Sequence, residues 1–386
     1  MKKKTLCFVT GSRAEFGLIH NLLKEATSKK NFRVNLLVTG MHLMKEFGFT
    51  HKEIKKSKIK ISKKIKTISS IKKNDYIIEA LAIGVKKFSN YFKKKKPNLI
   101  CLPADRHEML APAIAAFHQN VPIAHFFGGE LTNGSKDDTI RHCLTKLSNI
   151  HFVTHPIHKK RVIQLGEDPK NVYLVGNMTM DNISKTKIFP KKIVERKINH
   201  KFVRKNILVT YHPISTDIKK TKIELENLLY ALDKFKNIDI LFTKPNNDYG
   251  TGVVLNMIKN FVKKNKKRAK LYDSLGHRLY YSTVKKVDCV VGNSSSGLTE
   301  VPFLGTSSIN IGVRQSGRVG LENIINSPAK ISDITLTLKK TLSGKIKNKN
   351  IRNNIYFNSG ATQKVLKIID KVINTEIKKQ PFYDLK

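Results

Sequence analysis

Short apolar runs alternate with amphipathic segments along almost the whole chain, and this alternation restricts the possible fold more than any other feature of the sequence. The runs have the length of buried strands, and they lie at residues 6–10, 32–39, 97–102, 121–126, 150–154, 172–175, 206–211, 238–243, 288–291 and 308–311. Segments between them, such as residues 18–26 and 109–117, have helical spacing or composition. Strands that alternate with helices are typical of a mostly parallel sheet covered on both faces, so an α/β fold is predicted.

The length of the chain predicts two domains. It has 386 residues, more than one hydrophobic core usually accommodates. Residues 183–205 are lysine-rich and show no clear period, so they are predicted to connect the domains. The expected architecture is two Rossmann-like halves, residues 1–182 and 183–360, that face each other across a cleft.

The charge of the chain is strongly positive. A formal net charge of +44 arises from 73 Lys and Arg against 29 Asp and Glu, which permits contact with nucleic acid or an anionic membrane. The basic residues are nevertheless scattered through every segment, and no nucleic-acid-binding module is recognisable. A solvated lysine-rich surface, which would also attract a small anionic substrate, is therefore the favoured interpretation, and neither nucleic acid nor a membrane is predicted as a partner.

The cysteines and the apolar runs predict a cytosolic protein without a metal site. The four cysteines, Cys7, Cys101, Cys143 and Cys289, lie far apart and form no zinc-like spacing, so reduced thiols are expected. The apolar part of the N-terminus is too short for a signal peptide, and no run approaches the ~20 residues needed to cross a bilayer.

Two features of the N-terminal half suggest chemistry. The strand at residues 6–10 ends in Gly11-Ser12-Arg13, a turn that is predicted to face a phosphate because Ser12 can cap the following helix and Arg13 adds a guanidinium at its start. Neither GxGxxG nor a Walker A pattern is present, which argues against NAD, FAD and ATP sites of the usual kinds. Asp105 and Glu130 follow two strand ends, where ligands bind in open parallel sheets.

The pair Asp137-Asp138 precedes Arg141 by four and three residues, and two interpretations are open. On a helix this spacing usually gives a solvated ion pair worth up to about 0.5 kcal/mol. Alternatively, Asp138 and Glu130 form a pair of carboxylates whose burial and repulsion separate their pKa values, as proton abstraction beside an activated carbon requires.

Three motifs of the C-terminal half follow strand ends. His212 comes directly after a strand and before a proline, so its ring is expected at the sheet edge. Ser294, Ser295 and Ser296 are predicted to form an anion-binding concavity at a helix start. Glu300, about one to two turns into that helix, is a candidate acceptor for ribose hydroxyls, and Pro302 is expected to bend or shorten the helix.

Taken together, these motifs resemble the hydrolysing UDP-N-acetylglucosamine 2-epimerases of the sialic-acid (nonulosonic-acid) branch. The resemblance covers nearly the whole chain in matching order. It rests on residues 9–15 (VTGSRAE), 38–42 (VTGMH), 105–108 (DRHE), 128–130 (GGE), 140–147 (IRHCLTKL), 164–167 (QLGE), 211–213 (YHP), 292–297 (GNSSSG), 309–312 (INIG) and 314–318 (RQSGR).

The resemblance implies a fold of the GT-B type in which the C-terminal segment 361–386 returns to the first domain. It implies no cofactor, no metal and a homodimer. The implied reaction is anti elimination of the nucleotide across C1 and C2 of the sugar to a 2-acetamidoglucal, followed by hydration to free N-acetylmannosamine and UDP.

The resemblance also implies roles for individual residues. Asp105, Glu130 and Asp138 would be the acid/base carboxylates, and His212 would assist departure of the phosphate. The residues implied to bind the substrate or its nucleotide are Arg13, Arg141, Ser294, Ser295, Ser296, Glu300 and Arg314.

Four residues depart from the family pattern near the expected sugar or nucleotide. They are Ala104 in place of Gly, Asp138 in place of Glu, Phe127 in place of a polar residue and Val313 in place of Asp. These changes leave the implied reaction class intact, but they mean that the resemblance does not fix which sugar is the substrate. Phe126 and Phe127 are apolar candidates to face a 6-deoxy sugar.

Four hypotheses follow. The first is conversion of UDP-N-acetylglucosamine to N-acetylmannosamine for nonulosonic-acid synthesis. The second is the same reaction on UDP- or GDP-linked 2,4-diacetamido-2,4,6-trideoxyglucose, as in legionaminic-type routes. The third is a GT-B glycosyltransferase, which would pass the sugar to an acceptor. The fourth is a protein that binds nucleic acid or an anionic surface through its net charge.

Overall fold

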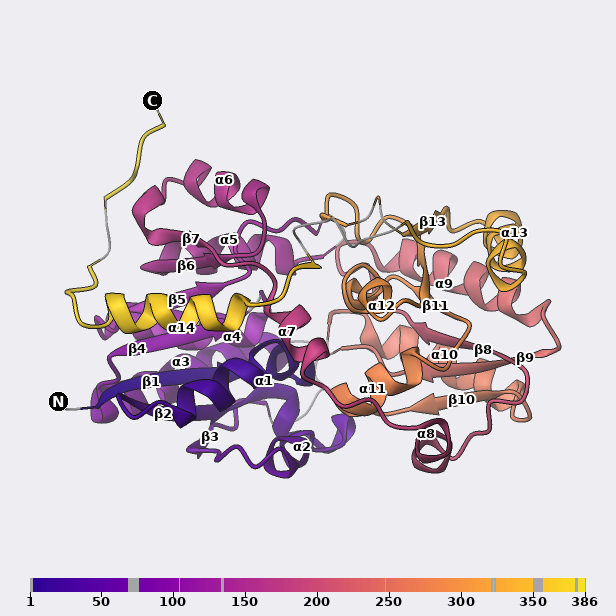
Figure 1. Cartoon of the computed structure of the whole chain (residues 1–386), viewed down its shortest axis with the longest axis horizontal. Coiled ribbons are helices and arrows are strands. Elements are labelled where there is room, and N and C mark those ends of the chain that lie inside the picture. The colour runs from indigo at the N-terminus through magenta and orange to yellow at the C-terminus, as the bar shows by residue number, and fades with distance from the viewer. Residues whose placement is uncertain are drawn as a thin grey trace. The chain divides into compact units, whose positions relative to one another are not determined.

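The structure is a computed structural model of the chain, and it describes residues 3–68, 76–103, 105–132, 135–246, 248–320, 322, 324–349, 357–378 and 381–385. The chain divides into two compact units. Unit 1 comprises Met1–Glu130, Asp137–Ser184 and Asn358–Lys386, and unit 2 comprises Leu131–Lys136 and Lys185–Phe357. Figure 1 shows the elements of both units along the chain.

The described strands of unit 1 form one seven-stranded parallel sheet. In spatial order they are β3 (Lys63–Lys64), β2 (Phe32–Val38), β1 (Lys4–Thr10), β4 (Leu99–Pro103), β5 (Ile123–Phe126), β6 (Ile150–Val153) and β7 (Val172–Leu174). The order 3-2-1-4-5-6 is that of the Rossmann fold, extended here by one strand.

Helices cover both faces of this sheet. They are α1 (Arg13–Ser28), α2 (His51–Lys56), α3 (Tyr76–Lys95), α4 (His107–His118), α5 (Asp137–Leu147), α6 (Pro156–Gln164), α7 (Met178–Ser184) and α14 (Ala361–Val372). Successive residues of β1 enter different cores: Leu6 and Phe8 pack with residues of α1 and α14, whereas Cys7 and Val9 pack with residues of α3 and α4. This is the side-chain alternation of a strand buried on both faces.

Helix α14 belongs to unit 1 although it follows unit 2 in the chain. Its residues Val365, Leu366 and Ile369 are buried in the same core as the apolar face of α1, and Figure 1 shows α14 in yellow across this face of the sheet. Asp181 of α7 accepts hydrogen bonds from the backbone amides of Gly360 and Thr362, so it satisfies donors at the start of α14 that the helix itself leaves unpaired.

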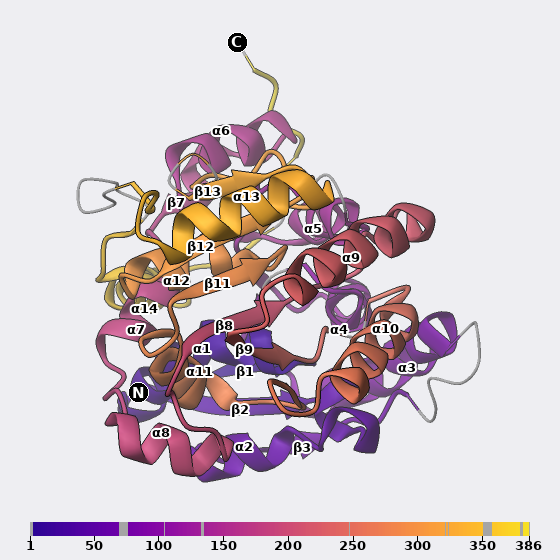
Figure 2. The same ribbon diagram turned by 90° about the vertical axis from the view of Figure 1, so that its right-hand side faces the viewer.

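The described strands of unit 2 form a second parallel sheet, of six strands. In spatial order they are β10 (Ala269–Tyr272), β9 (Ile238–Thr243), β8 (Lys205–Thr210), β11 (Cys289–Gly292), β12 (Ser307–Ile311) and β13 (Ile325–Ser327). Its helices are α8 (Lys191–Ile198), α9 (Ile218–Asp233), α10 (Thr251–Lys264), α11 (Gly276–Val284), α12 (Glu300–Phe303) and α13 (Ile331–Leu342). Helices α9, α10 and α13 bury one side of this sheet, and α9 and α13 lie side by side in Figure 2.

The predicted α/β fold with two Rossmann-like halves is confirmed. Residues 183–205, which were predicted to connect the domains and showed no clear period, contain a helix that was not predicted, α8. Its lysines and arginine hide the helical period, but Val194 and Ile198 are buried at the i, i+4 spacing of one helix face. The strands β10 and β13 and the helix α13 were not predicted, because β10 and β13 are short and α13 alternates apolar residues with Thr, Ser and Lys.

Three global expectations can be compared with the described residues. The four cysteines are free; Cys7, Cys101 and Cys289 are buried and Cys143 is exposed. Among the residues that the structure describes, no helix has the length and apolar character needed to span a bilayer. Within the same residues, no group of three or more His, Cys, Asp or Glu side chains is arranged to hold a metal ion.

Candidate functional site

One buried arginine gathers the acidic residues of unit 1. Arg141 lies in the second turn of α5, and its Nη1 donates hydrogen bonds to the Glu130 carbonyl at 2.7 Å and to Asp138 Oδ1 at 2.9 Å. Its Nη2 forms an ion pair with Asp105. The carboxyl end of β4, the carboxyl end of β5 and the first turn of α5 therefore meet at one guanidinium.

The burial of Arg141 distinguishes the two interpretations of its pairing with Asp138. The Arg141 side chain is 0% exposed and the Asp138 side chain 24% exposed, so the prediction of a solvated ion pair is wrong. Burial alone would lower the pKa of Arg141, but the charges of Asp105, Glu130 and Asp138 raise it above its ordinary value. One permanent positive charge thus lies against the carboxylates of Asp105 and Asp138 and close to a third acidic residue, Glu130.

The turn after β1 has the geometry that its sequence predicts. Ser12 caps α1: its Oγ accepts a hydrogen bond from the Glu15 amide, while Glu15 Oε2 accepts from the amides of Gly11 at 2.6 Å and Ser12 at 2.8 Å. This reciprocal capping box fixes the start of the helix. Arg13 is the first residue of α1 and is half-buried.

A second charged cluster, which the sequence reasoning missed, lies beneath this turn. Arg106 Nε and Nη2 contact the two carboxylate oxygens of Glu108 at 3.1 and 3.4 Å. Burial would raise the pKa of Glu108, but Arg106 holds it below its ordinary value, whereas burial and the neighbouring Glu108 raise the pKa of Glu15 to about 8. A Cβ atom at Gly11 or Gly40 would lie 2.7 or 2.8 Å from the Glu108 side chain, so Glu108 supports two loops that only glycine permits. The signal available in the sequence was the Asp-Arg-x-Glu motif itself.

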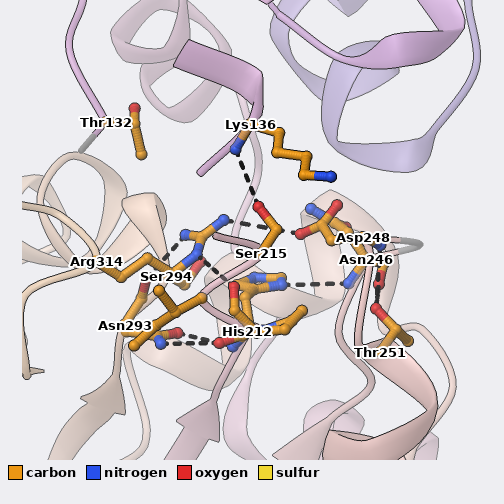
Figure 3. Close-up of polar contacts among 12 residues, drawn as sticks. Thr132, Lys136, His212, Ser215, Asn246, Asp248, Thr251, Asn293, Ser294 and Arg314 are labelled. Carbon is orange, nitrogen blue, oxygen red and sulfur yellow. Dashed lines mark hydrogen bonds and ion pairs between the residues drawn. The ribbon is translucent and has the colours of Figure 1, made fainter. Parts of the chain in front are cut away.

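In unit 2, His212 follows the carboxyl end of β8 and is held in one orientation. The backbone N–H of Asn246 donates to His212 Nδ1 at 3.2 Å (Figure 3). Because Nδ1 uses its lone pair as an acceptor, the neutral ring carries its proton on Nε2. His212 is 6% exposed, and the tautomer makes Nε2 a donor to an anion.

Asn293, at the end of β11, holds the backbone of His212. Its Oδ1 accepts from the His212 amide at 2.7 Å, and its Nδ2 donates to the His212 carbonyl at 2.9 Å (Figure 3). Sequence reasoning did not single out this residue, although it stands between Gly292 and Ser294 in the predicted loop. A Cβ atom at Gly292, whose φ is +142°, would lie 2.0 Å from the Thr210 carbonyl oxygen, so glycine lets β11 approach β8 closely here.

Arg314 contacts the backbone of the same two loops. Its Nε donates to the Pro213 carbonyl at 3.2 Å and its Nη1 to the Asn293 carbonyl at 3.1 Å, and Asp248 lies 3.7 Å from its Nη2 (Figure 3). Gln315 adds a hydrogen bond from its Nε2 to the same Asn293 carbonyl at 2.7 Å. Arg314 is only 6% exposed, so this geometry favours positioning of the His212 loop over direct contact with a ligand.

The short segment Leu131–Lys136 leaves unit 1 directly after Glu130 and belongs to unit 2. The Lys136 amide donates to Ser215 Oγ at 3.0 Å (Figure 3), and Arg318 Nε donates to Thr132 Oγ1 at 3.0 Å. The Lys136 ammonium also lies 5.1 Å from the centre of the Tyr249 ring. The segment therefore contacts the loop that follows His212.

Helix α11 contacts both the serine loop and Glu300. Ser294 Oγ lies 3.2 Å from Ser296 Oγ, which lies 2.7 Å from the Tyr280 hydroxyl. The next residue of α11, Tyr281, donates its hydroxyl hydrogen to Glu300 Oε1 at 3.1 Å. Burial raises the pKa of Glu300 to about 7.

The helix expected after the serines differs from the prediction. Ser295 lies in a single 3₁₀ turn (Ser295–Gly297), and Glu300 is the first residue of a helix that ends at Phe303, so the prediction that Glu300 lies one to two turns into a helix is wrong. Pro302, expected to bend or shorten this helix, lies within it, and such a short helix adds little dipole to an anion site. Hydroxyl groups and backbone amides remain the available donors.

The two phenylalanines expected to face the sugar, Phe126 and Phe127, lie in the core of unit 1. Phe126 stacks on Phe152 with ring centres 4.9 Å apart, and Phe127 is 7% exposed in the same core. The expectation that these rings face a sugar is therefore wrong, because both fill the core of unit 1. Ala104 lies outside the described residues.

Comparison with known proteins gives consistent results. Residues 24–370 match the family model described as UDP-N-acetylglucosamine 2-epimerase. The chain is 38% identical over 347 residues to the GDP/UDP-N,N'-diacetylbacillosamine 2-epimerase (hydrolyzing) of Campylobacter jejuni, which covers 90% of each chain. It is 31% identical over 385 residues to the polysialic acid biosynthesis protein P7 of Escherichia coli, covering 99% of this chain and 98% of the other.

Solved structures support the fold. The UDP-GlcNAc 2-epimerase of Neisseria meningitidis, bound to UDP-GlcNAc, superimposes with a TM-score of 0.78 at 16% identity and covers 95% of this chain and 100% of that one. The predicted α/β fold with two Rossmann-like units of the GT-B type, and the resemblance inferred from the motifs, are both confirmed.

Proposed function

The chain belongs to the UDP-N-acetylglucosamine 2-epimerase family, and we propose that it is a hydrolysing nucleotide-sugar 2-epimerase whose substrate is a UDP- or GDP-linked 2,4-diacetamido-2,4,6-trideoxyglucose. This sugar is N,N'-diacetylbacillosamine. The proposal for the sugar is supported by the relative at 38% identity, which is named for that substrate.

The observation that carries the reaction class is the convergence of the Asp105 and Asp138 carboxylates and the Glu130 backbone carbonyl on Arg141. Elimination requires a base that removes the proton from C2 while the bond between C1 and the diphosphate oxygen breaks and the nucleotide leaves with that electron pair. Hydration then adds water across the resulting C1–C2 double bond: the hydroxyl group bonds to C1 as a base takes the other proton of the water, and an acid delivers a proton to C2 on the face opposite to that from which the first proton was removed. Several carboxylates around one fixed cation supply the base and the acid that these two steps need.

His212 supports the departure of the nucleotide in this proposal. Its Nε2–H, set by the Asn246 amide on Nδ1, is a donor for a phosphate oxygen on which negative charge develops. Arg13, Ser294, Ser295 and Ser296 are proposed to bind the phosphates, and Glu300 the ribose. Arg141 is proposed to orient the carboxylates and Arg314 to position the His212 loop.

A second candidate substrate is UDP-N-acetylglucosamine, which the motifs of the sequence favoured. It is supported by the description of the family model and by the similarity to a polysialic acid biosynthesis protein. The product would be N-acetylmannosamine.

A homodimer also remains a prediction.

Proton NMR in D₂O tests the function and the substrate together. The purified protein is incubated separately with UDP- and GDP-linked diacetamido-trideoxyglucose and with UDP-N-acetylglucosamine. We expect release of a free manno-configured diacetamido sugar that carries deuterium at C2. Release of N-acetylmannosamine alone would establish the second candidate, and three intact nucleotide sugars would contradict the epimerase proposal and favour a transferase.

The residues are tested in the same assay. Asp105→Asn and Glu130→Gln should each reduce turnover by at least about a hundredfold, as expected for a lost acid or base. Glu46→Gln, at an exposed position of unit 1, is the matched control and should retain turnover. Wild-type rates from a folded Glu130→Gln protein would remove Glu130 from the mechanism.

A further inference from the structure

A basic groove lies on unit 2, at the amino ends of β8, β9 and β10 and beside the end of α8. It has a volume of about 780 Å³. The basic residues that line it come from α8, from the loop before β8, and from β10 and the turn before it; they are Lys192, Arg196, Lys201, Arg204, Lys267 and Lys270. We refer to these six residues as the basic groove.

The concentration of positive charge here exceeds what the composition of the chain provides. Lys and Arg make up 73 of the 386 residues of the chain but six of the eleven residues that line the groove. Eleven residues drawn at random from the whole chain would include about two Lys or Arg. Lys and Arg are therefore more frequent in the groove than in the chain as a whole.

The two acidic residues of the groove are already engaged. Asp239 is paired with Arg204 at 3.0 Å and with His200 at 3.7 Å, and its side chain is only 7% exposed. Glu195 Oε1 accepts a hydrogen bond from the Phe202 amide at 2.9 Å. Both carboxylates are therefore paired with groups of the protein itself.

Most of the basic side chains of the groove remain available to a ligand. Within the described part of the chain, the side chains of Lys192, Arg196, Lys201 and Lys267 make no hydrogen bond or ion pair. Arg204 is oriented by Asp239 while 43% of its side chain is exposed. The C-terminal end of α8 carries partial negative charge on its carbonyl groups, which would repel an anion. This repulsion is reduced because Lys270 and the Tyr272 hydroxyl donate hydrogen bonds to the carbonyls of Asn199 and Ile198.

The groove is separate from the His212 loop within the same unit. His212 follows the carboxyl end of β8, whereas Arg204 precedes its amino end, and Asp239 and Lys270 are the second residues of β9 and β10. A strand rises about 3.3 Å per residue, so the six residues of β8 separate the two places by roughly 20 Å. The His212 site and the groove therefore lie at opposite edges of one sheet.

We propose that the basic groove binds a small anion that carries two or more phosphate groups. Guanidinium and ammonium groups from three segments match several phosphate oxygens at once. The volume lies in the range of small-molecule sites. None of the eleven lining residues is Phe, Tyr or Trp, so the groove lacks the large aromatic side chains on which proteins commonly stack the bases of single-stranded nucleic acid.

The test is isothermal titration calorimetry of the full chain with inorganic tripolyphosphate at about 0.15 M salt, which screens the general field of the protein. Tripolyphosphate is expected to bind His212→Ala, because that variant leaves the groove intact. The double variant Arg196→Ala/Lys201→Ala should lose this binding event or weaken it at least about tenfold, since two charged hydrogen-bond donors are removed.

A charge-matched control separates the groove from the net charge. Lys55→Ala/Lys56→Ala removes two exposed lysines from α2 of unit 1, and its affinity for tripolyphosphate should stay within about twofold of the wild type. Equal weakening in both double variants, or no binding event in His212→Ala, would overturn the proposal. Tight binding of a 20-nucleotide single-stranded DNA to the wild type, lost in Arg196→Ala/Lys201→Ala and not displaced by tripolyphosphate, would instead assign the groove to nucleic acid.

Discussion

Asn293 forms two hydrogen bonds to the backbone of His212, accepting at Oδ1 from the amide at 2.7 Å and donating from Nδ2 to the carbonyl at 2.9 Å. An asparagine amide can satisfy both groups of one residue only if its oxygen faces the N–H and its nitrogen faces the C=O of that residue. The pair ties the end of β11 to the end of β8. It fixes the backbone from which the imidazole extends, while the Asn246 amide fixes the ring.

Replacing Asn293 should therefore reduce turnover, although Asn293 is not proposed to contact the substrate. In Asn293→Ala the His212 backbone loses both hydrogen bonds, and a displacement of the ring by about 1 Å is expected to lower kcat about a hundredfold. Steady-state kinetics on the substrate identified by NMR measure this effect. Asn227→Ala, which removes an asparagine hydrogen bond to the Ala329 carbonyl, is the control and should keep wild-type kcat; equal losses in both variants would argue against the positioning role.

Loss of Arg141 should destabilise unit 1. Arg141→Met keeps most of the side-chain volume but leaves Asp105 and Asp138 without their buried cation. Removal of one member of a buried ion pair costs about 3–5 kcal/mol, which urea unfolding should show as a lower midpoint. Arg33→Met, at an exposed position of β2, should leave the midpoint unchanged. An Arg141→Met protein as stable as the wild type would mean that these carboxylates are not buried against Arg141 in solution.

Glu15 should make stability depend on pH. Its pKa is raised from 4.5 to about 8 in the folded protein, so between these values the folded state binds more protons than the unfolded state. Stability therefore falls as pH rises from about 5 to 8. Glu15→Gln keeps an oxygen for the Gly11 and Ser12 amides but has no proton to lose, so its unfolding midpoint relative to the wild type should rise across this range. Parallel pH profiles for the two proteins would show that Glu15 is ionised throughout.

Glu300 should make substrate affinity depend on pH if it binds ribose. Burial raises its pKa to about 7, so the carboxylate that can accept two hydroxyl hydrogen bonds predominates only above that pH. We expect KM to rise as pH falls below about 7 while kcat is little affected by this group. In Glu300→Gln the KM should be high and independent of pH over the same range. A Glu300→Gln protein with the wild-type KM profile would exclude Glu300 from ribose binding.

Much of the fold was predictable because the strands are almost uniformly apolar. Runs such as Leu99–Pro103 and Ile238–Thr243 are buried along their whole length and stand out in the sequence. Helix α8 was missed because only its buried face, Val194 and Ile198, carries the period, and lysines fill the rest. In a chain this rich in lysine, surface helices resemble linkers.

The acidic residues of the candidate site were predictable from their positions after strand ends, but their organisation was not. Nothing in the spacing of Asp105, Glu130 and Arg141 indicates that one guanidinium contacts all three segments, since that depends on the order of β4, β5 and α5 in space. The interpretation of Phe126 and Phe127 failed for the same reason. Their neighbours are Phe152 and the core of unit 1, which the sequence order does not reveal.

The return of α14 to unit 1 has a consequence for the order in which the protein can fold during synthesis. One face of the first sheet is covered by Val365, Leu366 and Ile369, so its core stays incomplete until the final segment has left the ribosome. The core of unit 2 draws its buried residues from positions 207–338, all of which are translated before α14. The half that is translated first is thus completed last, and its exposed apolar face is the part of the nascent chain that most needs protection from aggregation.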